Sequence, residues 1–132
     1  MRVLALDYGS ARCGCALSDP TGTLATPIAP IAAPASRRGL AALERLVREQ
    51  NVTRVVVGLP LSLSGADSAQ TREAREFAAR LAARMGDAVA VEMHDERFTT
   101  RLAQGAPGAH RASEDSRAAA HLLEGWLASR AR

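Results

Sequence analysis

Three short apolar runs, separated by segments with helical spacing, constrain the fold of this chain most strongly. The runs span residues 2–7, 52–57 and 88–93, and each ends in, or is followed by, a glycine or an acidic motif. Runs of this length are typical of buried strands, because a helix usually needs about ten residues or more. Strands that alternate with helices predict a parallel arrangement in one sheet, joined by right-handed helical crossovers.

The stretch after the first run predicts an antiparallel meander. A second strand is expected over residues 13–18, followed by a turn signal at 19–22 and a third strand around 23–25. Prolines at positions 27, 30 and 34 then predict an irregular connection, because proline cannot donate a backbone hydrogen bond.

Helices are expected in three places. Ser36 is a suitable N-cap for a helix that runs to about residue 50, a second helix is expected over 69–85 before Gly86, and a third over about 113–129. The resulting order, βββαβαβα, predicts one α/β domain over the whole 132-residue chain, with a mixed sheet. We expect the first strand at the centre, so that the three apolar runs end at one edge of the sheet.

The composition fits a nucleic-acid ligand but does not require one. All 17 basic residues are Arg, and the formal net charge is +3. The planar Arg fork binds phosphate oxygens through two hydrogen bonds, yet a solvated Arg-rich surface explains the charge equally well. The chain has no apolar run of the ~18 residues that a membrane span requires, and Asp7 interrupts the first run too early for a signal peptide. We therefore expect a cytoplasmic protein with no membrane partner.

Acidic residues far apart in the sequence follow or begin three of the predicted elements. Asp7 ends the first apolar run, Asp95 and Glu96 follow the last one, and Asp115 begins the last predicted helix. Three carboxylates that converge would repel one another unless a divalent cation lay between them. Nucleases use such an arrangement for phosphodiester hydrolysis, so the pattern predicts a metal-dependent nuclease.

Each motif also has a plainer interpretation. The turn that begins at Asp7 could hold a metal, with Gly9 letting the backbone pass beside a phosphate. It is also typical of an ATP-phosphate turn in sugar kinases, or of an Asp that caps a tight turn. The loop that begins at Gly58 could bind a ligand or simply connect two elements. Asp115, beside Glu114, could serve only to stabilise the start of a helix.

Some other residues invite a functional interpretation. Cys13 and Cys15 supply too few ligands for a structural zinc site, and we expect two buried thiols that act as small hydrophobes. Trp126 is expected in the core or at a dimer contact. Four arginines are candidates for phosphate contacts: Arg12, Arg72, Arg75 and Arg80.

Four motifs, taken in order, resemble those of the YqgF family, also called RuvX. They are LDYGSARCGCA at residues 6–16, VVVGLPL at 55–61, HDERFTT at 94–100 and EDSRAAAHLL at 114–123. Members of this family are described provisionally as pre-16S rRNA nucleases and as Holliday junction resolvase-like proteins. The likeness extends from residue 1 to residue 127.

The resemblance implies an RNase H-like fold, with a five-stranded mixed sheet and helices on both faces. It also implies a Mg²⁺- or Mn²⁺-dependent nuclease that matures the 5′ end of 16S rRNA, while relatives in the wider superfamily resolve DNA junctions. Carried over by motif, the catalytic and metal-binding residues are Asp7, Glu96 and Asp115, with Asp95 beside Glu96.

The mechanism that follows from this resemblance is two-metal hydrolysis, in which Asp7 bridges two cations while Glu96 and Asp115 each hold one side. One cation lowers the pKa of an attacking water, and the other stabilises the leaving oxygen. The expected substrate is nucleic acid, either pre-rRNA or DNA. Four further residues are expected to contact it: Gly9, Arg12, Arg97 and Thr99.

The stretch between Thr100 and Asp115 holds fourteen residues, fewer than is usual in the family. Because the longer loop would help to engage nucleic acid, the shortening bears on substrate preference. The alternative to a nuclease is a non-catalytic RNA-binding ribosome-assembly factor on the same fold. The sequence leaves both a monomer and a homodimer open.

Overall fold

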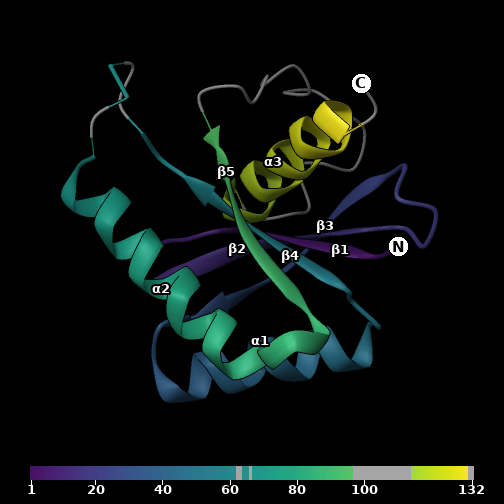
Figure 1. The fold of residues 1–132 in the computed structure, drawn as a ribbon, viewed down its shortest axis with the longest axis horizontal. Helices are drawn as coiled ribbons and strands as arrows, with labels where there is room; N and C mark the ends of the chain where they lie inside the picture. Colours follow the sequence, from purple (N-terminus) through teal and green to yellow (C-terminus); the bar gives the residue numbers. More distant parts are fainter. Residues whose placement is uncertain (62–63, 66, 97–113, 131–132) are drawn as a thin grey trace.

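The computed structural model describes residues 1–61, 64–65, 67–96 and 114–130, which form a five-stranded sheet and three α-helices (Figure 1). The elements are, in chain order, β1 (Val3–Asp7), β2 (Arg12–Ser18), β3 (Ala25–Ala32), α1 (Arg37–Glu49), β4 (Arg54–Leu59), α2 (Ala69–Met85), the short 3-10 helix η1 (Gly86–Ala88), β5 (Ala90–Asp95) and α3 (Glu114–Arg130).

The sheet is mixed, and β1 lies at its centre. The strand order is β3-β2-β1-β4-β5, in which β1 is antiparallel to β2 and parallel to β4, and β4 is parallel to β5. The predicted meander, the parallel additions and the central position of the first strand are therefore confirmed. Because β1, β4 and β5 run in the same direction, their carboxyl ends meet at one edge of the sheet.

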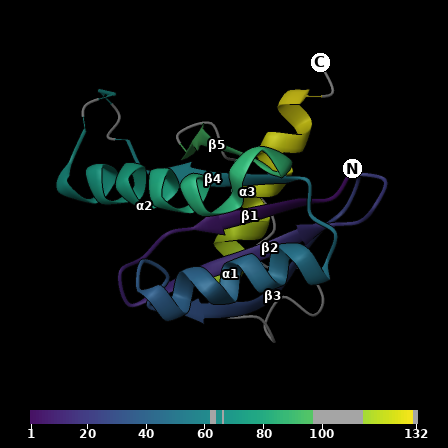
Figure 2. The ribbon, with the colours of Figure 1, turned by 60° about the horizontal axis from the view of Figure 1, so that its bottom comes forward.

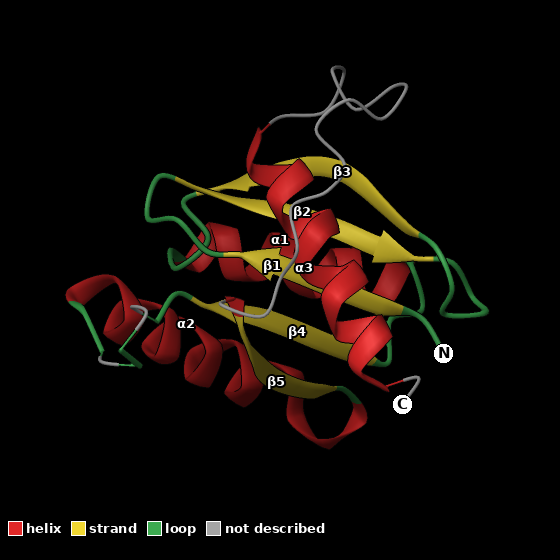
Figure 3. Ribbon diagram, turned by 90° about the horizontal axis from the view of Figure 1, so that it is seen from above, coloured by secondary structure: helices red, strands yellow, loops and turns green. Residues whose placement is uncertain are grey.

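Helices cover both faces of the sheet. In Figure 2, α1 and α2 lie in front of the sheet and α3 lies behind it, and Figure 3 shows α3 from its own side, across the strands. Along β1, Leu4 and Leu6 belong to the core on the α1 and α2 side, whereas Val3 and Ala5 belong to the core beneath α3. Since side chains alternate along a strand, Asp7 lies on the α3 side.

Local signals set the ends of α1 and α2 where the sequence predicts them. The Ser36 hydroxyl accepts a hydrogen bond from the Gly39 N–H at 3.0 Å, and the Ser68 hydroxyl accepts one from the Thr71 N–H at 3.2 Å. At the other end of α2, Gly86 adopts a φ of 68°, which a residue with a Cβ rarely adopts.

The third strand was predicted wrongly. It spans Ala25–Ala32 rather than residues 23–25, and it includes Pro27 and Pro30, which the sequence assigned to an irregular connection. β3 is an edge strand, and an edge strand pairs on one side only. Proline is tolerated there because its missing N–H can face away from the ladder.

Two later strands begin about two residues after their predicted starts. Val52 is buried but still belongs to the exit from α1, since its N–H donates to the Val47 carbonyl, and β4 starts at Arg54. The 3-10 helix η1 follows α2, so that β5 starts at Ala90 rather than at residue 88.

The core contains both cysteines and the single tryptophan. Cys13 and Cys15 are buried free thiols within the core on the α1 and α2 side, as predicted. Trp126 is 4% exposed in the core beneath α3. Cζ of the Arg130 guanidinium lies 4.9 Å from the centroid of the Trp126 ring. None of the three described helices combines the length and the apolar character that a membrane crossing needs.

Candidate active site

Asp7 lies at the carboxyl edge of the sheet with a glycine on each neighbouring strand. In β2 it is paired with Gly14. In β4 the parallel register sets Leu6 opposite Val57, so that one residue further along Asp7 comes beside Gly58. Neighbouring strands are about 4.8 Å apart. The two glycines therefore leave room for other groups on either side of the Asp7 carboxylate.

The space over Gly14 is filled by the start of α3. A Cβ on Gly14 would lie 1.9 Å from the Asp115 carbonyl oxygen and 2.8 Å from the Ser116 nitrogen. Ser116 is buried, and its hydroxyl accepts a hydrogen bond from the Cys15 N–H at 3.3 Å. These contacts fix the first turn of α3 on β2, which brings Asp115 next to the strand partner of Asp7.

The space over Gly58 is filled by a carboxylate. A Cβ on Gly58 would lie 2.3 Å from Oε1 of Glu96 and 2.9 Å from its Cδ. Val56 belongs to the core beneath α3, so Gly58, two residues later, faces the same side. The Glu96 carboxylate therefore lies over β4 on the face that carries Asp7.

Asp95 is directed differently from Glu96. It is the last residue of β5 and pairs with Leu59. Val91 and Met93 pack against the core on the α1 and α2 side, so strand alternation places Asp95 on that side as well. Of the two neighbouring acids, Glu96 is the one that shares a face with Asp7.

Arg12 pairs with one of the acids. Its Nε lies 2.7 Å from Oδ2 of Asp115, and the two side chains are 67% and 37% exposed. The pKa of the Cys13 thiol is raised well above its ordinary value by its hydrogen bond with Cys15 and by burial, and the charges of Asp7 and Asp115 add to the shift. Both acids are thus close enough to make the potential at Cys13 more negative.

The donor set matches the predicted cation by its chemistry. Mg²⁺ and Mn²⁺ prefer carboxylate oxygens, and Glu96 and Asp115 lie on either side of Asp7. Within residues 1–61, 64–65, 67–96 and 114–130, however, no group of three His, Cys, Asp or Glu side chains is arranged to hold a metal ion. The Asp115 carboxylate is directed to Arg12. It also lies in the first turn of α3, where an acid stabilises a helix, so the plainer interpretation of this residue holds too.

The other predicted substrate-binding residues are only partly described. A Cβ on Gly9 would lie 2.7 Å from the Arg12 carbonyl oxygen, so Gly9 permits the tight connection from β1 to β2 whether or not it meets a ligand. Arg97 and Thr99 lie outside the described residues.

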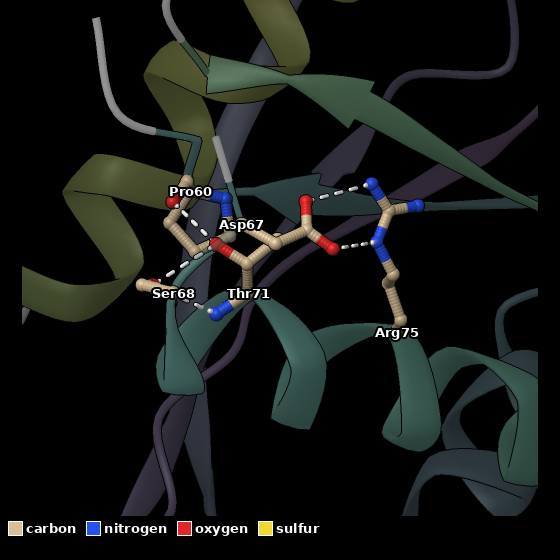
Figure 4. Close-up of polar contacts among 5 residues, drawn as sticks. All are labelled: Pro60, Asp67, Ser68, Thr71 and Arg75. Atoms are coloured by element: carbon tan, nitrogen blue, oxygen red, sulfur yellow. Dashed lines mark hydrogen bonds and ion pairs between the residues drawn. The ribbon is translucent and has the colours of Figure 1, made fainter. Parts of the chain in front are cut away.

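Several described polar groups after β4 make structural contacts (Figure 4). The buried Thr71 hydroxyl donates to the Pro60 carbonyl at 2.9 Å, which ties the start of α2 to the end of β4. Arg75, a candidate for phosphate contact, makes two 3.2 Å hydrogen bonds to Asp67. Arg72 and Arg80 are exposed on α2.

His94 also lies beside the candidate site, and sequence analysis did not single it out. It pairs with Gly58, and strand alternation sets it on the Asp7 side of the sheet. Its Nε2 is buried and has no hydrogen-bond partner in the described part of the chain, and burial lowers its pKa. Its place at the head of the HDER motif was the available signal.

A family model described as RuvX, Holliday junction resolvase, matches residues 1–129. The chain belongs to the RuvX family. A relative from Anaeromyxobacter dehalogenans is 38% identical over 138 aligned positions, which cover 99% of both chains. A relative from Koribacter versatilis is 48% identical over 99 residues, or 75% of this chain and 63% of that one. Both relatives carry the provisional name pre-16S rRNA nuclease.

Two solved structures share the fold at low sequence identity. RuvC of T. thermophilus, in complex with a Holliday junction substrate, matches with a TM-score of 0.65 at 12% identity and covers 99% of this chain and 96% of that one. The fowlpox virus resolvase, in complex with Holliday junction DNA, matches with a TM-score of 0.62 at 11% identity over the whole of both chains. These matches confirm the predicted RNase H-like fold of this RuvX member.

Proposed function

We propose that this RuvX member is a metal-dependent nuclease that hydrolyses phosphodiester bonds in structured RNA, with the 5′ end of pre-16S rRNA as its target. The observation that carries the proposal is the position of Asp7 between two strand glycines, with Asp115 over one and Glu96 over the other. Relatives that match this chain over its whole length carry the name of such a nuclease, which supports RNA as the substrate.

In this proposal Asp7, Glu96 and Asp115 hold Mg²⁺ or Mn²⁺ in a two-metal site. The bound ions would lower the pKa of the attacking water and offset charge on the leaving oxygen. Gly58 leaves space for the Glu96 carboxylate and Gly14 leaves space for the backbone of Asp115, on the face of the sheet that carries Asp7. Holding reacting groups in place before reaction is a large part of what an active site contributes.

Arginines and backbone are proposed to position the substrate. Arg12 is exposed at the same edge of the sheet, where its guanidinium can reach a phosphate through paired hydrogen bonds. Gly9, Arg97 and Thr99 are proposed as further substrate contacts. We expect the protein to act on nucleic acid in the cytoplasm.

The test is cleavage of an end-labelled panel that contains single-stranded RNA, single-stranded DNA, a 5′-extended rRNA hairpin and a four-way DNA junction. Each is incubated with Mg²⁺, Mn²⁺ or EDTA. Asp7→Asn is compared with Asp87→Asn, a control at the opposite edge of the sheet, where Asp87 is exposed just before β5. We expect metal-dependent cleavage of the hairpin that falls by about 10²-fold or more in Asp7→Asn and is unchanged in Asp87→Asn.

Each other outcome has a definite meaning. Cleavage by Asp7→Asn at the wild-type rate would contradict the assignment of the site. Cleavage of the junction in preference to the hairpin would make DNA the substrate. RNA binding in EDTA without any product in metal would favour the non-catalytic ribosome-assembly factor.

A further inference from the structure

The ion pair between Arg12 and Asp115 joins two segments, β2 and the start of α3, whose backbones are packed together. Arg12 begins β2, two residues before Gly14, and therefore projects from the same face of the strand. Asp115 is held over Gly14 by the contact of its carbonyl oxygen with that strand. The pair joins positions 103 residues apart in the sequence through two anchored segments.

The same carboxylate cannot serve Arg12 and a divalent cation equally well. Nε of Arg12 lies 2.7 Å from Oδ2 of Asp115, which is the distance of a charge-assisted hydrogen bond. A cation bound to this carboxylate would repel the guanidinium, and a cation bound through Oδ2 would also displace the Arg12 hydrogen bond directly. Because the Arg12 side chain is 67% exposed, it can swing away into solvent without disturbing the core.

We propose that Arg12 is a displaceable counter-ion of Asp115, which a divalent cation displaces, and that the freed guanidinium then binds a phosphate of the nucleic acid. Before the cation binds, Arg12 offsets part of the repulsion among the acids at this edge. Afterwards the same side chain is available for two hydrogen bonds to phosphate oxygens. Cation binding and substrate binding are thereby coupled. This proposal rests on the proposed function, because it takes Asp115 as a cation ligand.

The first test measures Mn²⁺ affinity by electron paramagnetic resonance, without substrate. Arg12→Met removes the charge and keeps much of the length of the side chain. Arg84→Met is the matched control, since Arg84 pairs with Glu44 between the two helices on the other face. An exposed pair is worth about 0.2–1 kcal/mol, so Arg12→Met should bind Mn²⁺ up to about 5-fold more tightly. Arg84→Met should bind it as the wild type does.

The second test measures RNA binding in EDTA, where no cation is present to displace Arg12. In the wild-type background Arg12 is held by Asp115, so Arg12→Met should change RNA affinity little. In the Asp115→Asn background the guanidinium is released, and Arg12→Met should then reduce RNA affinity several-fold. This non-additivity is the signature of the proposed switch. Equal effects in both backgrounds would contradict it.

The two proposals fail in different ways. Mn²⁺ binding by the wild type with no gain in Arg12→Met would overturn the counter-ion role and leave the proposed nuclease intact. No Mn²⁺ binding by any variant would overturn both the counter-ion role and the metal site. A thermal melt of Arg12→Met close to that of the wild type, as expected for a side chain that is 67% exposed, confirms that the variant is folded.

Discussion

Replacing Gly58 by Ala should impair function far more than stability. The new Cβ would lie 2.3 Å from Oε1 and 3.1 Å from Cγ of Glu96. Carbon and oxygen atoms in ordinary contact are about 3.5 Å apart, so the Glu96 carboxylate must move by roughly 1 Å or more. A misplacement of about 1 Å at a catalytic group can reduce activity about 10²-fold. The three nearest atoms belong to the Glu96 side chain, which can turn, so the free energy of unfolding should fall by less than about 1 kcal/mol.

Gly14→Ala is the matched comparison on the other side of Asp7. Here the Cβ would lie 1.9 Å from the carbonyl oxygen and 2.2 Å from the carbonyl carbon of Asp115, both backbone atoms. The start of α3 must shift as a whole, which should lower the free energy of unfolding by about 1–3 kcal/mol or more.

Urea denaturation and single-turnover cleavage of the rRNA hairpin measure the two effects separately. We expect Gly58→Ala to have a near-normal denaturation midpoint and slow cleavage, and Gly14→Ala to lose both stability and cleavage. Cleavage by Gly58→Ala at the wild-type rate would contradict a catalytic role for Glu96. A loss of stability in Gly58→Ala as large as that in Gly14→Ala would contradict the expectation that the Glu96 side chain can move aside.

Two further predictions concern stability. The Thr21 hydroxyl and the N–H groups of Leu24 and Thr23 donate to Asp19, which lowers its pKa well below the ordinary value of 3.8. The stability that these bonds add is therefore fully present above about pH 4 and is lost as the pH falls further. In urea denaturation, the free energies of unfolding of the wild type and Asp19→Asn should converge in acid. A difference between them that does not depend on pH would contradict this. Phe77 is 1% exposed and stacks on Tyr8 with ring centroids 4.7 Å apart. Phe77→Ala should therefore lower the free energy of unfolding by about 3–5 kcal/mol. A loss below about 1 kcal/mol in the same assay would contradict that packing.

The sequence predicts the ends of α1 and α2 correctly, because residues at or close to each end determine where the helix begins or stops. Ser36 and Ser68 cap their helices through groups three residues away, and Gly86 ends α2 through its own backbone conformation. The sequence does not predict the extent of β3, because Pro27 and Pro30 are acceptable only in an outermost strand of the sheet. Which strand lies at the edge is decided by the order of all five strands.

Only part of the candidate site could be predicted, because some of its contacts depend on how distant segments meet in the fold. Asp7, Glu96 and Asp115 stand out by motif, and the fold brings the segments that carry them to one edge of the sheet. The roles of Gly14 and Gly58 could not be read from the sequence, because the atoms that occupy the missing side-chain space come from other elements. The pairing of Arg12 with Asp115 is likewise a consequence of the fold.

The most direct test of the central claim, that the three acids form one cation site, is thermal unfolding with and without Mn²⁺. Binding to the folded state at a hundredfold excess over Kd adds about 2.7 kcal/mol of stability. The wild type should therefore melt several degrees higher in Mn²⁺, and Asp7→Asn, Glu96→Gln and Asp115→Asn should each lose most of that increase, whereas Asp87→Asn should keep it. An increase in melting temperature that survives in all three acid variants would contradict the account.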